Sequence, residues 1–164
     1  MPHNKDILWK GLLEWIFDDL LRFKFQDADR VFNLSEQFVF MDKELATLTP
    51  GSEDEMTVRV VDKLVKVQLK SNMPALVHVE IQGATKKEER RLFGARMFQY
   101  FNLILAKHSR PLAAIAIYTG ESGHLFPKSY SYSLMNTQIR YQYDTLNIWD
   151  YSDGELFDSN NPFA

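Results

Sequence analysis

Hydrophobic residues near the N-terminus recur at the three- and four-residue spacing of an amphipathic helix. This spacing predicts one long helix over residues 5–24, with Asn4 as its N-cap. The residues expected on its buried face are Leu8, Leu12, Trp15, Ile16, Leu20 and Phe23. A short apolar run at residues 38–41 predicts a strand, and the small acidic segment at residues 51–56 predicts a surface loop.

The stretch from residue 58 to residue 83 predicts two strands joined by a turn at residues 71–74. In the second strand an apolar face alternates with a polar one, formed by Val77, Val79 and Ile81 and by His78, Glu80 and Gln82. In the first strand the apolar positions change phase, because Leu64 is followed directly by Val65. Strict period-two alternation does not allow such a change, so we expect a bulge or bend just after Asp62.

The second half of the chain predicts another long helix and further strands. Residues 86–108 have helical spacing, with a buried face of Phe93, Met97, Phe101 and Ile104 that Tyr100 and Leu105 widen. The apolar run at residues 112–118 is typical of a strand buried on both faces. Alternation from residue 130 to residue 148 predicts two or three peripheral strands, and the last residues show no periodicity. This order of elements predicts an α/β fold, a mixed sheet packed between helices.

Composition indicates an ordinary globular domain. The 164 residues are 45% hydrophobic and 25% charged, which suits one domain with a sizeable core. No apolar run approaches the roughly 20 residues of a membrane-spanning helix, and the first residues lack the apolar segment of a secretory signal. There is no cysteine, which excludes disulfides and thiolate metal sites and agrees with the cytoplasmic location that we expect.

Charge is distributed unevenly along the chain, whose net charge is −3. Residues 57–110 contain 11 Lys and Arg against 4 Asp and Glu, a net of +7 (11 − 4), whereas the segments on either side are acidic. A basic segment suggests a polyanionic partner, although the same residues also suit solvated strand and helix surfaces. The side chains that we expect to contact nucleic acid are Lys63, Lys66, Lys86, Lys87, Arg90 and Arg91.

The candidate site consists of Asp62, Glu80 and Gln82. Asp62 interrupts an apolar face, and a carboxylate there must find a partner because burying it unpaired is costly. Glu80 and Gln82 are two residues apart on one strand, so their side chains project to the same face. Mg²⁺ often takes one or two carboxylates, which Asp62 and Glu80 could supply from adjacent strands. Two other interpretations stay open. Asp62 could be a strand-end acid paired with a lysine, and Glu80 and Gln82 could form the exposed polar face of an edge strand.

Several segments together resemble a known family. They are HNKDILWKGLLEWIF, VVDKLVKV, LVHVEIQG and ARMFQYF, followed by a buried strand. This pattern resembles the PD-(D/E)XK nuclease superfamily, and more narrowly its bacterial transposase-like branch, which includes the recombination-promoting nucleases. The resemblance implies a restriction-endonuclease-like α/β fold over residues 1–150 and a DNA endonuclease that depends on Mg²⁺ or Mn²⁺. It also implies that residues 151–164 are a tail, the start of a missing C-terminal region.

The resemblance further implies roles for individual residues. Asp62 and Glu80 match the two acids of the family's motif, and the backbone carbonyl of Ile81 would be a third metal ligand. Gln82 stands where the superfamily usually has lysine. A neutral amide can orient a water molecule but cannot supply positive charge.

Four further residues would support this site: Asp6, Lys10, Arg96 and Tyr100. The resemblance matches Asp6 to an acid of the family's first helix, and Arg96 with Tyr100 to its arginine–tyrosine helix. Lys10 is one of the lysines that could approach the site. Because of Gln82, a nucleic-acid-binding module that does not cut is a second interpretation. A structural domain of a longer protein, which could form a homo-oligomer through its aromatic-rich terminal strands, is a third.

Overall fold

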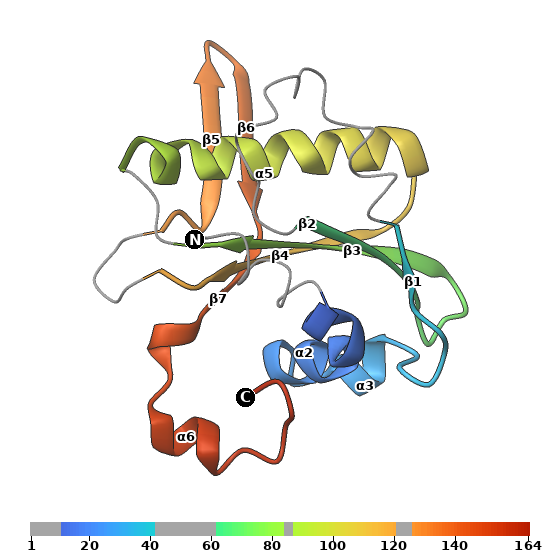
Figure 1. Ribbon diagram of the computed structural model, residues 1–164. Coiled ribbons are helices and arrows are strands. Elements are labelled where there is room, and N and C mark those ends of the chain that lie inside the picture. The colour runs from blue at the N-terminus through green and yellow to red at the C-terminus, as the bar shows by residue number, and fades with distance from the viewer. Residues whose placement is uncertain (1–10, 42–61, 84–86, 121–125) are drawn as a thin grey trace.

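The computed structural model describes residues 11–41, 62–83, 87–120 and 126–164, without the side chains of residues 62, 87–89 and 157. Figure 1 shows a mixed α/β arrangement in three layers, with one long helix on one face of a sheet and shorter helices on the other. The order of helix, strand pair, helix, buried strand and peripheral strands agrees with the sequence prediction. None of the helices in these ranges is long and apolar enough to cross a membrane.

The main sheet has five strands in the order β1-β2-β3-β4-β7. Their bounds are Val39–Phe40 for β1, Asp62–Gln68 for β2, Pro74–Gln82 for β3, Leu112–Tyr118 for β4 and Asp144–Asn147 for β7. The first three strands are antiparallel, whereas β4 runs parallel to both β3 and β7. β3 is therefore the central strand, as its continuous burial requires.

The helix over β3 and β4 is α5, Lys87–His108, close to the predicted span. Its buried side chains include Phe93, Met97, Tyr100 and Ile104. All four belong to the predicted face, which Tyr100 widens, whereas Phe101 is only partly buried and Leu105 is exposed. The apolar run of β4 lies between α5 and the opposite core, which confirms that it is buried on both faces.

The N-terminal helical region is divided, and its buried face differs from the prediction. Residues 11–15 are helical, the chain bends at residue 16, and α2 continues over Phe17–Lys24, followed by the short α3, Ala28–Val31. Leu13, Phe17 and Leu20 are buried, whereas Leu12 and Trp15 are exposed. Both sets of residues have helical spacing, so the period alone could not determine which of the two faces meets the sheet.

The β2–β3 hairpin contains no bulge within its described residues. Pairing is continuous from Asp62 opposite Glu80 to Gln68 opposite Pro74. Leu64 packs with residues of α5, whereas Val65 packs in the core on the α2 side. Both faces of β2 are buried, which explains why the apolar residues Leu64 and Val65 follow each other directly. The predicted bulge or bend just after Asp62 was therefore wrong.

A separate two-stranded sheet packs against α5 and extends beyond it (Figure 1). It consists of β5, Ser129–Leu134, and β6, Thr137–Gln142, in agreement with the predicted peripheral strands. Gly94 of α5 lies at the contact, since an added Cβ atom would be 2.7 Å from the carbonyl oxygen of Ser129. Glycine at this position therefore permits a close approach of the two backbones.

The C-terminal residues are more regular than predicted. A 3₁₀ turn, η1, covers Ile148–Asp150, and a short helix, α6, covers Asp153–Phe157. A capping box between Ser152 and Glu155 forms the N-terminus of α6. This signal is local and does not depend on hydrophobic periodicity, so the absence of periodicity in the tail did not indicate it. Phe163 packs against Phe23 of α2 with ring centroids 5.4 Å apart, so this segment returns to the core on the α2 face.

Candidate functional site

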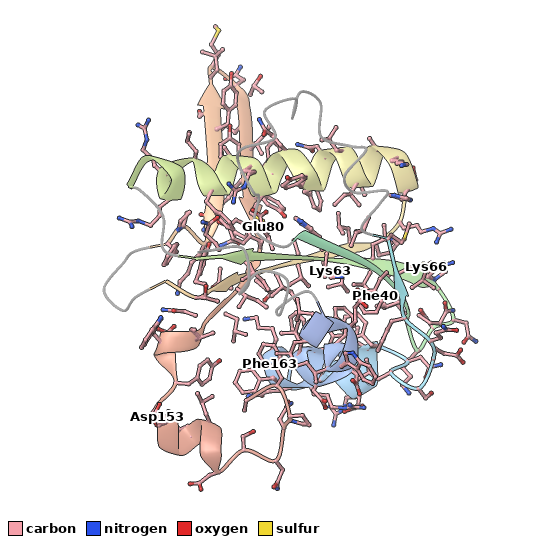
Figure 2. All side chains as sticks on the ribbon, viewed as in Figure 1. Phe40, Lys63, Lys66, Glu80, Asp153 and Phe163 are labelled. Atoms are coloured by element: carbon pink, nitrogen blue, oxygen red, sulfur yellow. The ribbon has the colours of Figure 1, made fainter. Side chains whose placement is uncertain are left out.

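The polar residues of β3 lie in the interior beneath α5. His78, Glu80 and Gln82 are all buried, and Glu80 is only 2% exposed. Because β3 is central and α5 covers this face, they are not the polar face of an exposed edge strand. Figure 2 shows Glu80 between the sheet and α5. A carboxylate in such a position needs a compensating charge.

Arg96 of α5 supplies a positive charge to this cluster. Its Nε donates to Oε1 of Glu80 at 2.7 Å, and its Nη2 donates to Oε1 of Gln82 at 2.6 Å. Nη2 also forms an ion pair with Oε1 of Glu80. The guanidinium carbon lies 5.0 Å from the ring centroid of Phe93. The Arg96 side chain is 35% exposed, so it connects the buried carboxylate with the protein surface.

Position 62 lies directly opposite Glu80 in the register of β2 and β3. Opposed positions of an antiparallel pair lie on the same face of a sheet, with Cβ atoms about 4.5–5.5 Å apart. The two candidate positions are therefore neighbours across the strand pair, as the sequence interpretation required. Joint binding of a cation by Asp62 and Glu80 stays a prediction.

His78 and Tyr100 extend the buried cluster toward the middle of the sheet. Their rings meet edge to face with centroids 5.3 Å apart. Neither ring nitrogen of His78 has a hydrogen-bond partner among the described atoms. Burial, together with the positive charge of Arg96, lowers the pKa of His78 to about 4, so its ring is neutral at pH 7. Tyr100 lies one turn after Arg96, and both side chains face the sheet.

Lys63 occupies a different place from the one predicted. It lies on the face of β2 opposite to that of Glu80, and its side chain is buried. Its Nζ forms an ion pair with Oε1 of Glu14 at 2.5 Å and lies 5.3 Å from the ring centroid of Phe40 (Figure 2). A buried ammonium on the far face is not available to a phosphate at the candidate site, which corrects the prediction of a nucleic-acid contact.

The Glu14–Lys63 pair was not identified from the sequence. The signal was present, because Lys63 alternates with Val65 and Val67 and therefore occupies a core position of its strand. A lysine among core residues requires an acidic partner from the element packed above it. This partner is Glu14, which belongs to the helical residues before α2.

The other basic candidates are spread over the structure. Lys66 is four residues from Asp62 along β2, about 13 Å away, and lines a polar pocket of about 320 Å³ together with Glu36. Arg90 is partly buried and Arg91 exposed near the start of α5. Lys87 is the first residue of α5, but its side chain is not described.

Three predicted site residues, Asp6, Lys10 and Lys86, lie outside the described residues, as do the predicted N-cap Asn4, Leu8 and the predicted loop at residues 51–56. Ile81 belongs to β3, and its side chain is in the core on the α2 face. Among the described side chains, no group of three or more His, Asp or Glu residues is placed to hold a metal ion. Comparison of the chain with family models, with curated proteins and with solved structures gives no match.

Proposed function

We propose that this chain is a metal-dependent DNA endonuclease with a restriction-endonuclease-like fold, of the transposase- or recombination-related kind that its resemblance implies. The observation that carries the proposal is the β2–β3 register, which pairs position 62 with Glu80. The order of elements supports it, because an antiparallel β1–β2–β3 unit is followed by α5 and by β4 parallel to β3.

The formal charges of the cluster fit a divalent cation. The formal charges of two acids at positions 62 and 80 and of one guanidinium at position 96 sum to −1 (−2 + 1). Carboxylate and carbonyl oxygens, which Asp62, Glu80 and Ile81 would provide, are the ligands that Mg²⁺ prefers. Such an ion would offset negative charge on the phosphate and lower the pKa of a bound water molecule.

The chain's own residues would orient these ligands. The two contacts from Arg96 fix the carboxylate of Glu80 and the amide of Gln82 relative to each other. Burial beneath α5 excludes bulk water from Glu80, which strengthens its interaction with a positive charge. The partly exposed Arg96 contacts Glu80 and would therefore be close to a phosphate that approaches this carboxylate.

Nicking of supercoiled plasmid in Mg²⁺ or Mn²⁺ tests this proposal. We expect Asp62→Asn and Glu80→Gln to abolish nicking and to weaken Mn²⁺ binding measured by calorimetry. Glu36→Gln is the matched control, because Glu36 is an exposed acid in the loop before β1. Circular dichroism verifies that each variant is folded. Nicking at the wild-type rate in both site variants would exclude the nuclease.

A nucleic-acid-binding module without cleavage is the second candidate function. It is favoured by the contacts of Arg96 with the Glu80 carboxylate, which already bring a positive charge to this acid, and by the neutral Gln82. In this case the protein binds DNA in the presence of a chelator, and calorimetry detects no Mn²⁺ binding. Binding of Mn²⁺ that depends on Glu80 would decide against it.

A further inference from the structure

The β5–β6 ribbon, residues 129–142, has two chemically different faces. Directly opposed residues share a face, and the pairs alternate between the two faces along the ribbon. One face carries the pairs Tyr130–Tyr141, Tyr132–Ile139 and Leu134–Thr137. The other, the polar face, carries Ser129–Gln142, Ser131–Arg140 and Ser133–Gln138.

Packing against α5 determines where the polar face points. The rings of Tyr130 and Phe98 are stacked with centroids 5.1 Å apart, and those of Tyr141 and Phe101 are 4.8 Å apart. Because the tyrosine face is held against the helix, the polar face is directed away from it. All six residues of the polar face are exposed. The ribbon extends beyond α5, on the same side of the main sheet as Glu80 (Figures 1 and 2).

The charge of this region differs from that of the chain as a whole. The chain contains 22 Asp and Glu, yet residues 122–143 contain none, while Lys128 and Arg140 lie in this segment. Among the described residues, no ion pair involves Arg140, which stands in the middle of the polar face. A face whose six residues include an arginine and no carboxylate is complementary to a polyanion.

We propose that the polar face of the β5–β6 ribbon enters the major groove of duplex DNA and contacts base edges there. This inference rests on the proposed function and specifies duplex DNA as the substrate of the same protein. A two-stranded β-ribbon fits the major groove, where arginine pairs with guanine, glutamine with adenine, and serine with either. The roughly 20 Å length of a six-residue strand corresponds to about six base pairs.

The tip of the ribbon carries exposed apolar residues on the other face and at the turn, including Tyr132, Leu134 and Met135. These side chains would suit a second copy of the chain, and the test therefore includes self-association. The polar face favours DNA, because its serine, glutamine and arginine side chains contribute little apolar area to a protein interface. They are instead the side chains of direct base recognition.

Fluorescence anisotropy in a chelator tests the inference, since binding is then measured without cleavage. A duplex is first selected from a random library with the wild-type chain. We expect Arg140→Ala and Gln138→Ala each to weaken binding to this duplex about 5- to 100-fold and to relax the selected sequence. Arg30→Ala removes the same charge from an exposed position on α3, on the far face of the sheet, and leaves affinity within about 2-fold.

Wild-type affinity in both ribbon variants would overturn the inference. A second result would also overturn it. In this case the wild type is an oligomer by light scattering, the double variant Leu134→Ser and Met135→Ser is a monomer, and Arg140→Ala leaves DNA binding unchanged. Failure of the nuclease is recognised separately. If Arg140→Ala weakens binding but the wild type does not nick DNA, the ribbon is supported and the nuclease is excluded. If nicking requires Glu80 but the ribbon variants bind DNA with wild-type affinity, the nuclease is supported and the ribbon inference is excluded.

Discussion

Replacing Arg96 by methionine removes the guanidinium from a carboxylate that remains in the interior. Glu80 is 2% exposed, so water cannot replace the lost donor without entering the space beneath α5. Removing one partner of a buried ion pair costs about 3–5 kcal/mol. Because Arg96 is itself 35% exposed, we expect a smaller loss, about 2–3 kcal/mol in the free energy of unfolding.

Arg22→Met is the matched control for this substitution. The Arg22 side chain is 38% exposed, nearly the same as Arg96, and Arg22 contacts Asp18 at 2.7 Å and Asp29 at 3.2 Å. These two acids lie on the surface, where ion pairs contribute about 0–1 kcal/mol. A difference between the two variants therefore reports the burial of the acid rather than the number of contacts.

Urea denaturation followed by circular dichroism in a chelator measures both variants. For a domain of this size, about 2–3 kcal/mol corresponds to a decrease in Tm of about 4–12 °C. A double-mutant cycle with Glu80→Gln should give a coupling energy of about 1–3 kcal/mol. Equal losses in Arg96→Met and Arg22→Met, or a coupling energy below about 0.5 kcal/mol, would refute the reasoning.

Three further predictions concern packing and protonation, each measured by urea denaturation. Leu13→Ala should cost about 2–5 kcal/mol and Leu12→Ala less than about 1 kcal/mol, because only Leu13 is buried; equal costs would contradict the assigned helix face. Gly94→Ala should cost about 1–3 kcal/mol, because its methyl group would meet the Ser129 carbonyl; an unchanged stability would place the ribbon elsewhere. The pKa of His78 is lowered to about 4, so the unfolded chain binds its proton first and stability falls as the pH decreases from 6.5 to 4. His78→Leu should lose less stability over this range, measured in a chelator, and a loss equal to that of the wild type would contradict the assignment.

Elements whose burial follows from local periodicity could be predicted from the sequence. The alternation of β3, the continuous apolar run of β4 and the span of α5 each appeared close to its predicted place. The proximity of positions 62 and 80 also followed from the hairpin, because a short turn determines which residues oppose each other. These features depend on neighbours in the chain or on a single face of one element.

Features that depend on distant partners could not be predicted in this way. The buried face of the N-terminal helix required knowledge of which apolar side the sheet would meet, and Leu13 rather than Leu12 meets it. Lys63 is buried because Glu14, 49 residues away, supplies its partner. The simultaneous contact of Arg96 with Glu80 and Gln82 depends on how α5 lies over β3, which no local pattern encodes.

The position of β3 between a near neighbour and a remote one has a consequence for folding kinetics. β3 follows β2 through a short turn, whereas Val77 pairs with Ala113 of β4, 36 residues later (113 − 77), after the whole of α5. Local hairpins close in microseconds, while remote pairing must first overcome a larger loop entropy. We expect φ-values that are higher in the hairpin than at the contact of Arg96 with Glu80. During refolding the hairpin would thus align positions 62 and 80 before α5 docks. Arg96 would contact Glu80 only after the two acidic positions are in place.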